Sequence, residues 1–281
     1  MSDAVRLLRL AFQEWRTGKA RNQPRRRLVL PTGSVLHQLA GARGRYFGAK
    51  IYSTHPQHGA HFHVLLYDAE TARPLAMIEA NWLGQIRTGA ASGLATDWLA
   101  GAEASTLGVI GTGFQSASQI EAIRAVRPIQ SVRVWGRDAE KRKRFADANQ
   151  AVAVATAEEA VRDSDIVVTM TSAKDPVLEA DWVSAEAHVN AAGSNRATHR
   201  ELPAELIARA ARIVVDDREQ AKIESGDLIL ANFNWSDPRL MELKDVEAAD
   251  ERPGISIFKS NGLGLEDIAV AGYIYERVAL T

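Results

Sequence analysis

Apolar side chains recur at helical spacing over the first turns of the chain. The positions on one helical face are Val5, Leu8, Phe12 and Trp15. Ser2 is a residue type that caps helix N-termini, and Gly18 is one that ends helices. The spacing therefore predicts an amphipathic helix over residues 2–16.

Shorter apolar runs follow, some with the alternation of a half-buried strand, and they predict strands. They lie around residues 28–30, 48–52, 61–68 and 74–80. The arginine-rich segment 21–27 contains Pro24 and is predicted to be a basic loop. A helix is expected to begin after Arg87 and to run to about Leu99.

From Thr106 onward, apolar strands alternate with helical patterns. Strand-like runs lie at residues 107–110, 131–135, 165–170, 188–192, 212–216 and 255–258. A charged helix is predicted over residues 139–148, and a last helix from about Leu265. Strands that alternate with helices predict a parallel sheet with right-handed crossovers. The change of pattern predicts a domain boundary near residue 101.

The composition narrows the classes of function. The formal net charge is −1, so neither a nucleic acid nor an anionic membrane surface is an expected partner. The chain has no cysteine, which excludes disulfides, thiolate metal sites and cysteine nucleophiles. It also lacks an apolar run long enough to span a membrane and the pattern of a signal peptide. We therefore expect a cytoplasmic protein.

A single arginine, Arg87, stands just before a run of very small residues at positions 89–93 and 95. We interpret this run as the start of a helix, where unpaired N–H groups carry a partial positive charge. The guanidinium of Arg87 adds a planar fork that fits a carboxylate. The segment therefore predicts a binding site for a small acid.

A glycine turn, Gly-x-Gly-x-x-Ser, follows the strand at 107–110 and precedes a helical pattern. Gly111 permits a tight turn, and Gly113 allows a pyrophosphate to approach the backbone. The fold class expected is therefore α/β, with a Rossmann-type doubly wound parallel sheet over residues 101–254. A second α+β domain would comprise residues 1–100 and be completed by about 255–281.

The residues after the second strand of this sheet bear on the choice of cofactor. An acidic residue there binds the ribose 2′-OH of NAD, whereas a basic one accommodates the 2′-phosphate of NADP. Arg137 occupies this region, with Lys141 and Arg142 one turn later, and favours NADP(H). Asp138 leaves NAD(H) open, because it could pair with Arg137 or serve the ribose itself.

Several short motifs occur together and in order along the chain. They are Arg87–Ser92, the glycine turn, Val168–Ser172, Asn190–Ser194, Glu224–Asp227 and Phe258–Ser260. This combination resembles the ornithine cyclodeaminase/μ-crystallin family over nearly the whole chain. The resemblance implies a two-domain homodimer that binds NAD(H) or NADP(H) in its central domain. It also implies a small amino or imino acid as the substrate, bound by the other domain.

The resemblance assigns roles to individual positions. Arg25 and Arg87 match carboxylate-binding arginines, and Lys50 matches a lysine that faces the substrate. The residues expected at the cofactor are Gly111, Gly113, Phe114, Gln115, Arg137, Thr171, Ser172 and Ser194. Four crowded histidines, His55, His58, His61 and His63, are expected to bind no metal, because their spacing matches no common metal site.

One position departs from the family pattern. Cyclodeaminases carry an acid/base aspartate after the Asn-Ala-x-Gly motif, whereas this chain has Asn195, whose amide cannot exchange a proton in that way. We therefore assign catalysis to Lys50, Arg87 and Asn195, with Lys50 as the candidate acid for an imine nitrogen.

The expected function is NAD(P)H-dependent reduction of a small 2-imino or cyclic ketimine acid. Two alternatives stay open. One is an ornithine- or lysine-type cyclodeaminase with bound NAD(H). The other is a cofactor-bound binding protein with little catalysis, in the way that μ-crystallin binds thyroid hormone.

Overall fold

The computed structural model describes residues 1–246 and 253–279. Contacts divide the chain into two compact units. We call residues Asp3–Arg87 and Gly262–Thr281 the antiparallel unit, and Met1–Ser2 with Thr88–Asn261 the parallel unit. The sequence placed the boundaries near residues 101 and 255. The structural division instead falls between Arg87 and Thr88, within helix α2 (Asn81–Leu99), and between Asn261 and Gly262.

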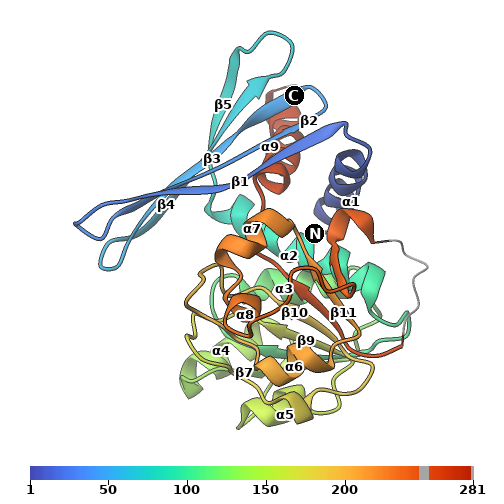
Figure 1. Ribbon diagram of the computed structural model, residues 1–281. Helices are drawn as coiled ribbons and strands as arrows, with labels where there is room; N and C mark the ends of the chain where they lie inside the picture. Colours follow the sequence, from blue (N-terminus) through green and yellow to red (C-terminus); the bar gives the residue numbers. More distant parts are fainter. Residues whose placement is uncertain (247–252, 280–281) are drawn as a thin grey trace. The chain divides into compact units, whose positions relative to one another are not determined.

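The antiparallel unit is a five-stranded meander with two helices (Figure 1). Its elements are α1 (Ser2–Arg16), β1 (Ala20–Val29), β2 (Val35–Arg43), β3 (Tyr46–His55), β4 (Gly59–Asp68), β5 (Pro74–Glu79) and α9 (Gly264–Ala279). The strands pair in chain order, and each pair is antiparallel. The predicted first helix is confirmed, with Phe12 fully buried on its apolar face. A bidentate pair between Arg43 and Glu14, at 2.9 and 3.0 Å, ties this helix to β2.

Two predictions for this region are wrong. The supposed basic loop at 21–27 lies within strand β1, and strand β2 was missed. Pro24 is tolerated because β1 is an edge strand and its register shifts between Gln23 and Arg26. Because β2 contains few strongly apolar residues, its alternation is weak.

Helix α9 approaches the meander very closely. A Cβ on Gly41 of β2 would lie 2.6 Å from the backbone of Leu265, and one on Gly264 would lie 2.6 Å from the carbonyl oxygen of Ala40. Only glycine permits this approach, since any larger side chain would separate helix and sheet. The contact fixes the first turn of α9 against β2 and β3.

The parallel unit contains an eight-stranded sheet in the order β12-β11-β13-β10-β9-β6-β7-β8, and all its strand pairs are parallel. The strands are β6 (Thr106–Ile110), β7 (Ser131–Trp135), β8 (Val152–Ala153), β9 (Ile166–Thr169), β10 (His188–Ala191), β11 (Arg212–Val215), β12 (Leu240–Glu242) and β13 (Ser256–Lys259). This confirms the predicted doubly wound α/β class. Strand β13, which the sequence assigned to the other domain, pairs with β10 and β11, because a local pattern does not reveal which sheet a strand joins.

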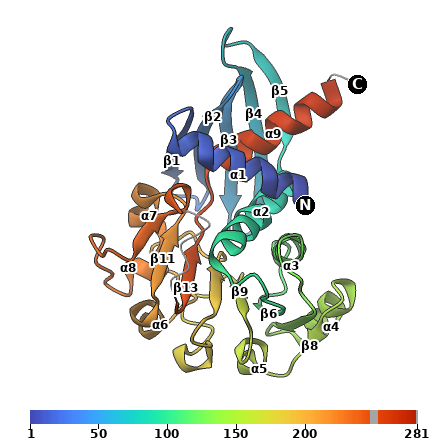
Figure 2. The ribbon, with the colours of Figure 1, turned by 90° about the vertical axis from the view of Figure 1, so that its right-hand side faces the viewer.

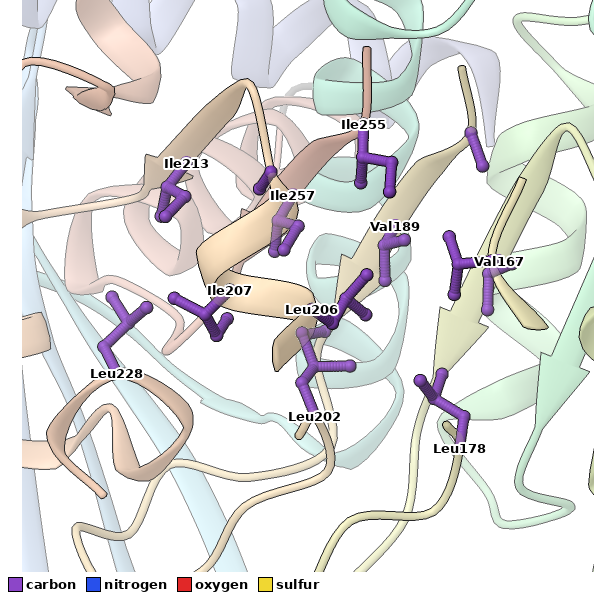
Figure 3. Packing of buried hydrophobic residues seen from close by; sticks show 14 of the residues in the cluster. Val167, Leu178, Val189, Leu202, Leu206, Ile207, Ile213, Leu228, Ile255 and Ile257 are labelled. Carbon is purple, nitrogen blue, oxygen red and sulfur yellow. The ribbon is translucent and has the colours of Figure 1, made fainter. Parts of the chain in front are cut away.

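Short helices connect these strands, with α3 and α4 near one end of the sheet and α6 to α8 near the other (Figure 2). They are α3 (Ser116–Arg124), α4 (Ala139–Ala148), α5 (Ala157–Val161), α6 (Ala204–Arg209), α7 (Arg218–Glu224) and α8 (Gly226–Ile229), with 3-10 turns at Ala180–Trp182 and Leu243–Asp245. One core cluster joins strand residues such as Val189 and Ile257 to Leu206 of α6 (Figure 3). A second cluster joins β6, β7 and β9 to α3. Apolar burial on both faces is why these strands are nearly continuous hydrophobic runs.

Candidate functional site

The parallel unit reverses its strand order at β6. The chain goes from β6 to β7 and β8 on one side, and returns to β9 on the other side of β6. In such sheets ligands bind outside the carboxyl ends of the strands at this reversal. A cleft of about 920 Å³ lies at these strand ends.

The glycine turn forms one wall of this cleft. Gly111 has φ +122°, and a Cβ there would collide with the carbonyl oxygen of Met170. A Cβ on Gly113 would meet nothing within 4 Å, so the space beside it is open. Oε1 of Gln115 is buried without a hydrogen-bond partner among the described residues. An open backbone at a helix start fits the pyrophosphate of a dinucleotide.

The end of β7 forms the next wall, which we call the ribose end. Arg137 and Lys141 line it and are exposed. The carboxylate of Asp138 accepts a hydrogen bond from the backbone N–H of Lys141 at 2.8 Å and caps α4. This hydrogen bond lowers the pKa of Asp138. Arg142, by contrast, donates to the carbonyl oxygen of Gly136 at 2.9 Å. Arg137 and Lys141 are therefore the basic side chains at the ribose end.

Most of the other residues predicted at the cofactor also line the cleft. Phe114, Thr171 and Ser172 do so, together with Gly193 after β10. Ser194 is buried outside the lining, and its hydroxyl donates to the carbonyl oxygen of His199 at 3.1 Å. Asn195 follows it in the same loop and is half-buried.

The antiparallel unit brings together Arg25, Lys50 and Arg87, which we call the cation group. They come from β1, β3 and α2, and each is less than a tenth exposed. Arg25 donates to the carbonyl oxygen of Gly262 at 3.2 Å. The structure thus places all three predicted substrate-binding residues in one unit, buried from water.

Two carboxylates in the first turn of α9 hold this group in place. Asp267 Oδ1 accepts from Lys50 Nζ and from Arg87 Nε, each at 3.1 Å. Glu266 Oε2 accepts from the Arg87 guanidinium at 2.9 Å. The sequence analysis missed both acids, although two carboxylates at the start of a helix were visible in the chain.

The pKa values within the group follow from burial and charge. Burial lowers the pKa of Lys50 to about 8; the nearby arginines lower it further and Asp267 opposes them. Burial also acts to lower the pKa of Arg87, but the two carboxylates outweigh it and raise that pKa. Arg87 is therefore a fixed cation, whereas Lys50 can change its charge near neutral pH.

Arg87 does not stand before a helix, as the sequence had suggested. Helix α2 begins six residues earlier, at Asn81, whose N–H donates to Glu79 Oε1 at 3.0 Å. The prediction failed because Gly84 interrupts the apolar pattern. This glycine has a spatial role, since a Cβ on it would lie 2.9 Å from Lys50 Nζ. The cation group therefore does not lie at the start of α2.

An aromatic row lies beside Lys50 on the same face of the sheet, and the sequence analysis did not identify it. Tyr52 stacks on His37 with ring centroids 4.2 Å apart and on Phe62 at 4.8 Å. Lys50 Nζ lies 5.3 Å from the Phe62 ring centroid. The row supplies a flat apolar wall next to the cations.

The crowded histidines do not form a recognisable metal site. The His55 and His58 rings stack at 4.6 Å, while His61 and His63 are exposed. Within residues 1–246 and 253–279, no cluster of three or more metal-ligating side chains occurs. In the same residues, no helix has the length and apolar character needed to cross a bilayer.

Comparison with known proteins identifies the family. The sequence profile of the ornithine cyclodeaminase/mu-crystallin family matches residues 1–281. The chain belongs to this family.

Individual relatives agree with that assignment. The chain is 40% identical over 232 residues to a Delta(1)-pyrroline-2-carboxylate reductase of Bacillus cereus, covering 76% of this chain and 70% of the relative. It is 34% identical over 296 residues to an alanine dehydrogenase of Archaeoglobus fulgidus, covering 99% and 90%. A Delta(1)-pyrroline-2-carboxylate reductase of Thermococcus litoralis, solved in complex with NADH and L-proline, superposes with a TM-score of 0.91. That structure is 28% identical and covers 99% of this chain and 93% of its own.

Proposed function

We propose that this chain is an NAD(P)H-dependent reductase of a small 2-imino or cyclic ketimine carboxylic acid, acting in reverse as an amino-acid dehydrogenase. It is an NAD(P)-dependent oxidoreductase that acts on imine or amino groups. The observation that carries the proposal is the buried cation group, in a chain that also has a dinucleotide cleft.

The charges of the group favour a small carboxylate. Arg25, Lys50 and Arg87 carry three positive charges, and Glu266 and Asp267 carry two negative ones. Among these five side chains the positive charges outnumber the negative ones by one, which favours an incoming monocarboxylate. Guanidinium forks bind carboxylates through paired charge-assisted hydrogen bonds.

Reduction of a C=N bond adds a hydride at carbon and a proton at nitrogen. When bound, the reduced nicotinamide supplies the hydride. We assign the proton to Lys50 Nζ, because a pKa of about 8 leaves the amine mostly protonated at pH 7 yet acidic enough to release its proton. Asp267 orients Nζ through their 3.1 Å hydrogen bond. We assign Asn195 a hydrogen-bonding role toward the substrate nitrogen or the cofactor.

We propose NADP(H) as the preferred cofactor, with NAD(H) as the alternative. The support is the ribose end, where Arg137 and Lys141 line the cleft while the carboxylate of Asp138 caps α4. An acid that caps its own helix is less suited to bind a ribose hydroxyl, and two exposed cations suit a 2′-phosphate.

We also propose a homodimer formed through the face of the meander that points away from α9. Side chains alternate between the faces of a strand, so Phe47 lies opposite Gly48 and Lys50. Phe47 contacts Tyr67 with ring centroids 5.4 Å apart, and Met77 is 71% exposed. An apolar sheet face with exposed large side chains is typical of an interface.

A direct assay of cofactor oxidation tests the proposal. NADPH and NADH oxidation would be followed with Δ1-pyrroline-2-carboxylate, Δ1-piperideine-2-carboxylate, pyruvate plus an amine, and oxaloacetate plus ammonia. We expect turnover of at least one imine, with NADPH preferred. Release of ammonia from ornithine or lysine without net cofactor turnover would instead establish a cyclodeaminase. Tight NADPH binding with no turnover over the whole panel would favour the binding protein.

A further inference from the structure

A buried carboxylate, Glu201, lies behind the wall of the cleft and is not itself part of the lining. It is 0% exposed and follows the loop after β10. Oε1 accepts from the backbone N–H and the hydroxyl of Thr171, each at 2.7 Å. Oε2 accepts from the Gly193 N–H at 2.8 Å and the Thr169 hydroxyl at 3.1 Å. Both carboxylate oxygens therefore have two donors each.

These donors belong to the end of strand β9 and to the segments that follow β9 and its neighbour β10. Thr171 and Gly193 both line the cleft, so one carboxylate links two parts of its wall. A Cβ on Gly193 would lie 2.5 Å from Glu201 Oε1. The glycine of the Asn-Ala-x-Gly motif thus leaves the space that this carboxylate occupies.

A second buried carboxylate holds Glu201 itself. Asp227 Oδ1 accepts from the backbone N–H groups of Glu201 and Leu202, at 2.6 and 2.9 Å. Its other oxygen lies 2.9 Å from Lys259 Nζ, which also donates to the carbonyl oxygen of Ser194 at 2.6 Å. The network ends on the residue directly before Asn195. Two motifs that carried the family resemblance, those at 224–227 and 258–260, therefore act on the same loop.

Burying the charged form of Glu201 costs free energy, so its hydrogen bonds must offset that cost. Burial raises the pKa of Glu201, and the Asp227 carboxylate adds to that effect while Lys259 opposes it. Besides the attraction of Lys259, the charge of this buried carboxylate is stabilised by its hydrogen bonds. Here three of the four hydrogen bonds are made to the segments after β9 and β10, and the fourth is made to Thr169, the last residue of β9.

We propose that Glu201 is a positioning residue of the cofactor site, fixing the segments after β9 and β10 so that they bind the nicotinamide half of the cofactor. In this type of sheet the adenosine ribose binds at the end of β7. Because β9 and β10 lie on the other side of β6, the nicotinamide half of the cofactor would bind beside them. The inference rests on the proposed function only in that the cleft binds NAD(P)H.

The test substitutes Glu201→Gln and measures binding without any imine substrate. The amide keeps the shape of the side chain, but its NH₂ group cannot accept from the donors that it faces. We expect the Kd for NADPH, titrated by its fluorescence, to rise about tenfold, as for a lost charge-assisted contact. The Kd for ADP, which represents only the adenosine half, should stay within about twofold of wild type on the same reasoning.

Two further variants keep the test decisive. Glu205→Gln, an exposed position on α6, is the matched control and should bind both probes like wild type. Thr169→Val is the substitute if Glu201→Gln does not fold, because it removes one donor that lies outside the cleft lining. It should weaken the binding of NADPH by a smaller factor and leave the binding of ADP unchanged. Equal affinity of Glu201→Gln for NADPH, or equal weakening of NADPH and ADP, would overturn the inference. A wild-type protein that binds neither NADPH nor NADH would instead refute the proposed function.

Discussion

The two functional regions of this molecule present positive potential in different ways. The cleft of the parallel unit offers open backbone at Gly113 and two exposed cations at its ribose end. The antiparallel unit instead buries three cations against two carboxylates. Exposed charges are screened by water and salt, whereas buried charges interact strongly and are costly when left unpaired. Substitutions in the cation group should therefore have larger effects than substitutions of the ribose-end charges.

Arg87→Ala should produce the largest loss. It removes the carboxylate fork and leaves Glu266 and Asp267 without their main partner, so we expect about 2–4 kcal/mol less transition-state binding. Comparing kcat/KM with the best imino acid measures the effect. Arg45→Ala, an exposed arginine paired with Asp68, is the control. Near-normal kcat/KM in Arg87→Ala would contradict the carboxylate assignment.

Lys50→Met should lower kcat about a hundredfold, the usual contribution of a general acid. Because the acid form is needed for reduction, wild-type kcat/KM should fall as the pH rises through about 8. Amine oxidation needs the neutral amine and should rise over the same range. Lys50→Met should lose the pH dependence of both reduction and amine oxidation. Lys19→Met, which replaces an exposed lysine, should keep both. If Lys50→Met keeps the wild-type kcat and only raises KM, Lys50 binds the substrate and does not act as the general acid.

Gly113→Ala should separate cofactor binding from stability. A Cβ there meets no protein atom within 4 Å, so Tm should stay near wild type while NADPH affinity falls about tenfold as the methyl group enters the pyrophosphate space. Gly111→Ala should lower both, because of its φ of +122° and the collision with Met170. Thermal melts and fluorescence titrations measure the two quantities. Unchanged NADPH affinity in Gly113→Ala would argue against this turn as the phosphate site.

Arg137→Ser should have the smallest effect. We expect the ratio of kcat/KM for NADPH over NADH to fall roughly five- to tenfold, since an exposed ion pair contributes about 1 kcal/mol. The effect should weaken at high salt. Lys143→Ser, on the same helix as Lys141 but paired with Asp147, is the control and should leave the ratio unchanged. A ratio that does not move in Arg137→Ser would favour NAD(H) as the natural cofactor.

The accuracy of the sequence predictions depended on how local each feature is. Helix α4 was predicted with the bounds that it has, and the strand before the glycine turn was located correctly, because neighbouring residues set both. Residues 21–27 of strand β1 were taken for a loop, since Pro24 is acceptable only at an edge, and edges are defined by pairing. The start of α2 was missed because Gly84 interrupts the apolar pattern, whereas in the structure this glycine leaves room for Lys50.

The sequence by itself determined the α/β class, the glycine turn after β6 and the three residues of the cation group. These depend on periodicity and on contiguous motifs, which are local properties of the chain. Only the tertiary structure decided which groups pair with the cations. Asp267 lies 217 positions after Lys50 and 180 after Arg87, and close packing of α9 on Gly41 brings them together. The pKa of Lys50 depends on that burial and those neighbours, so no local pattern could have supplied it.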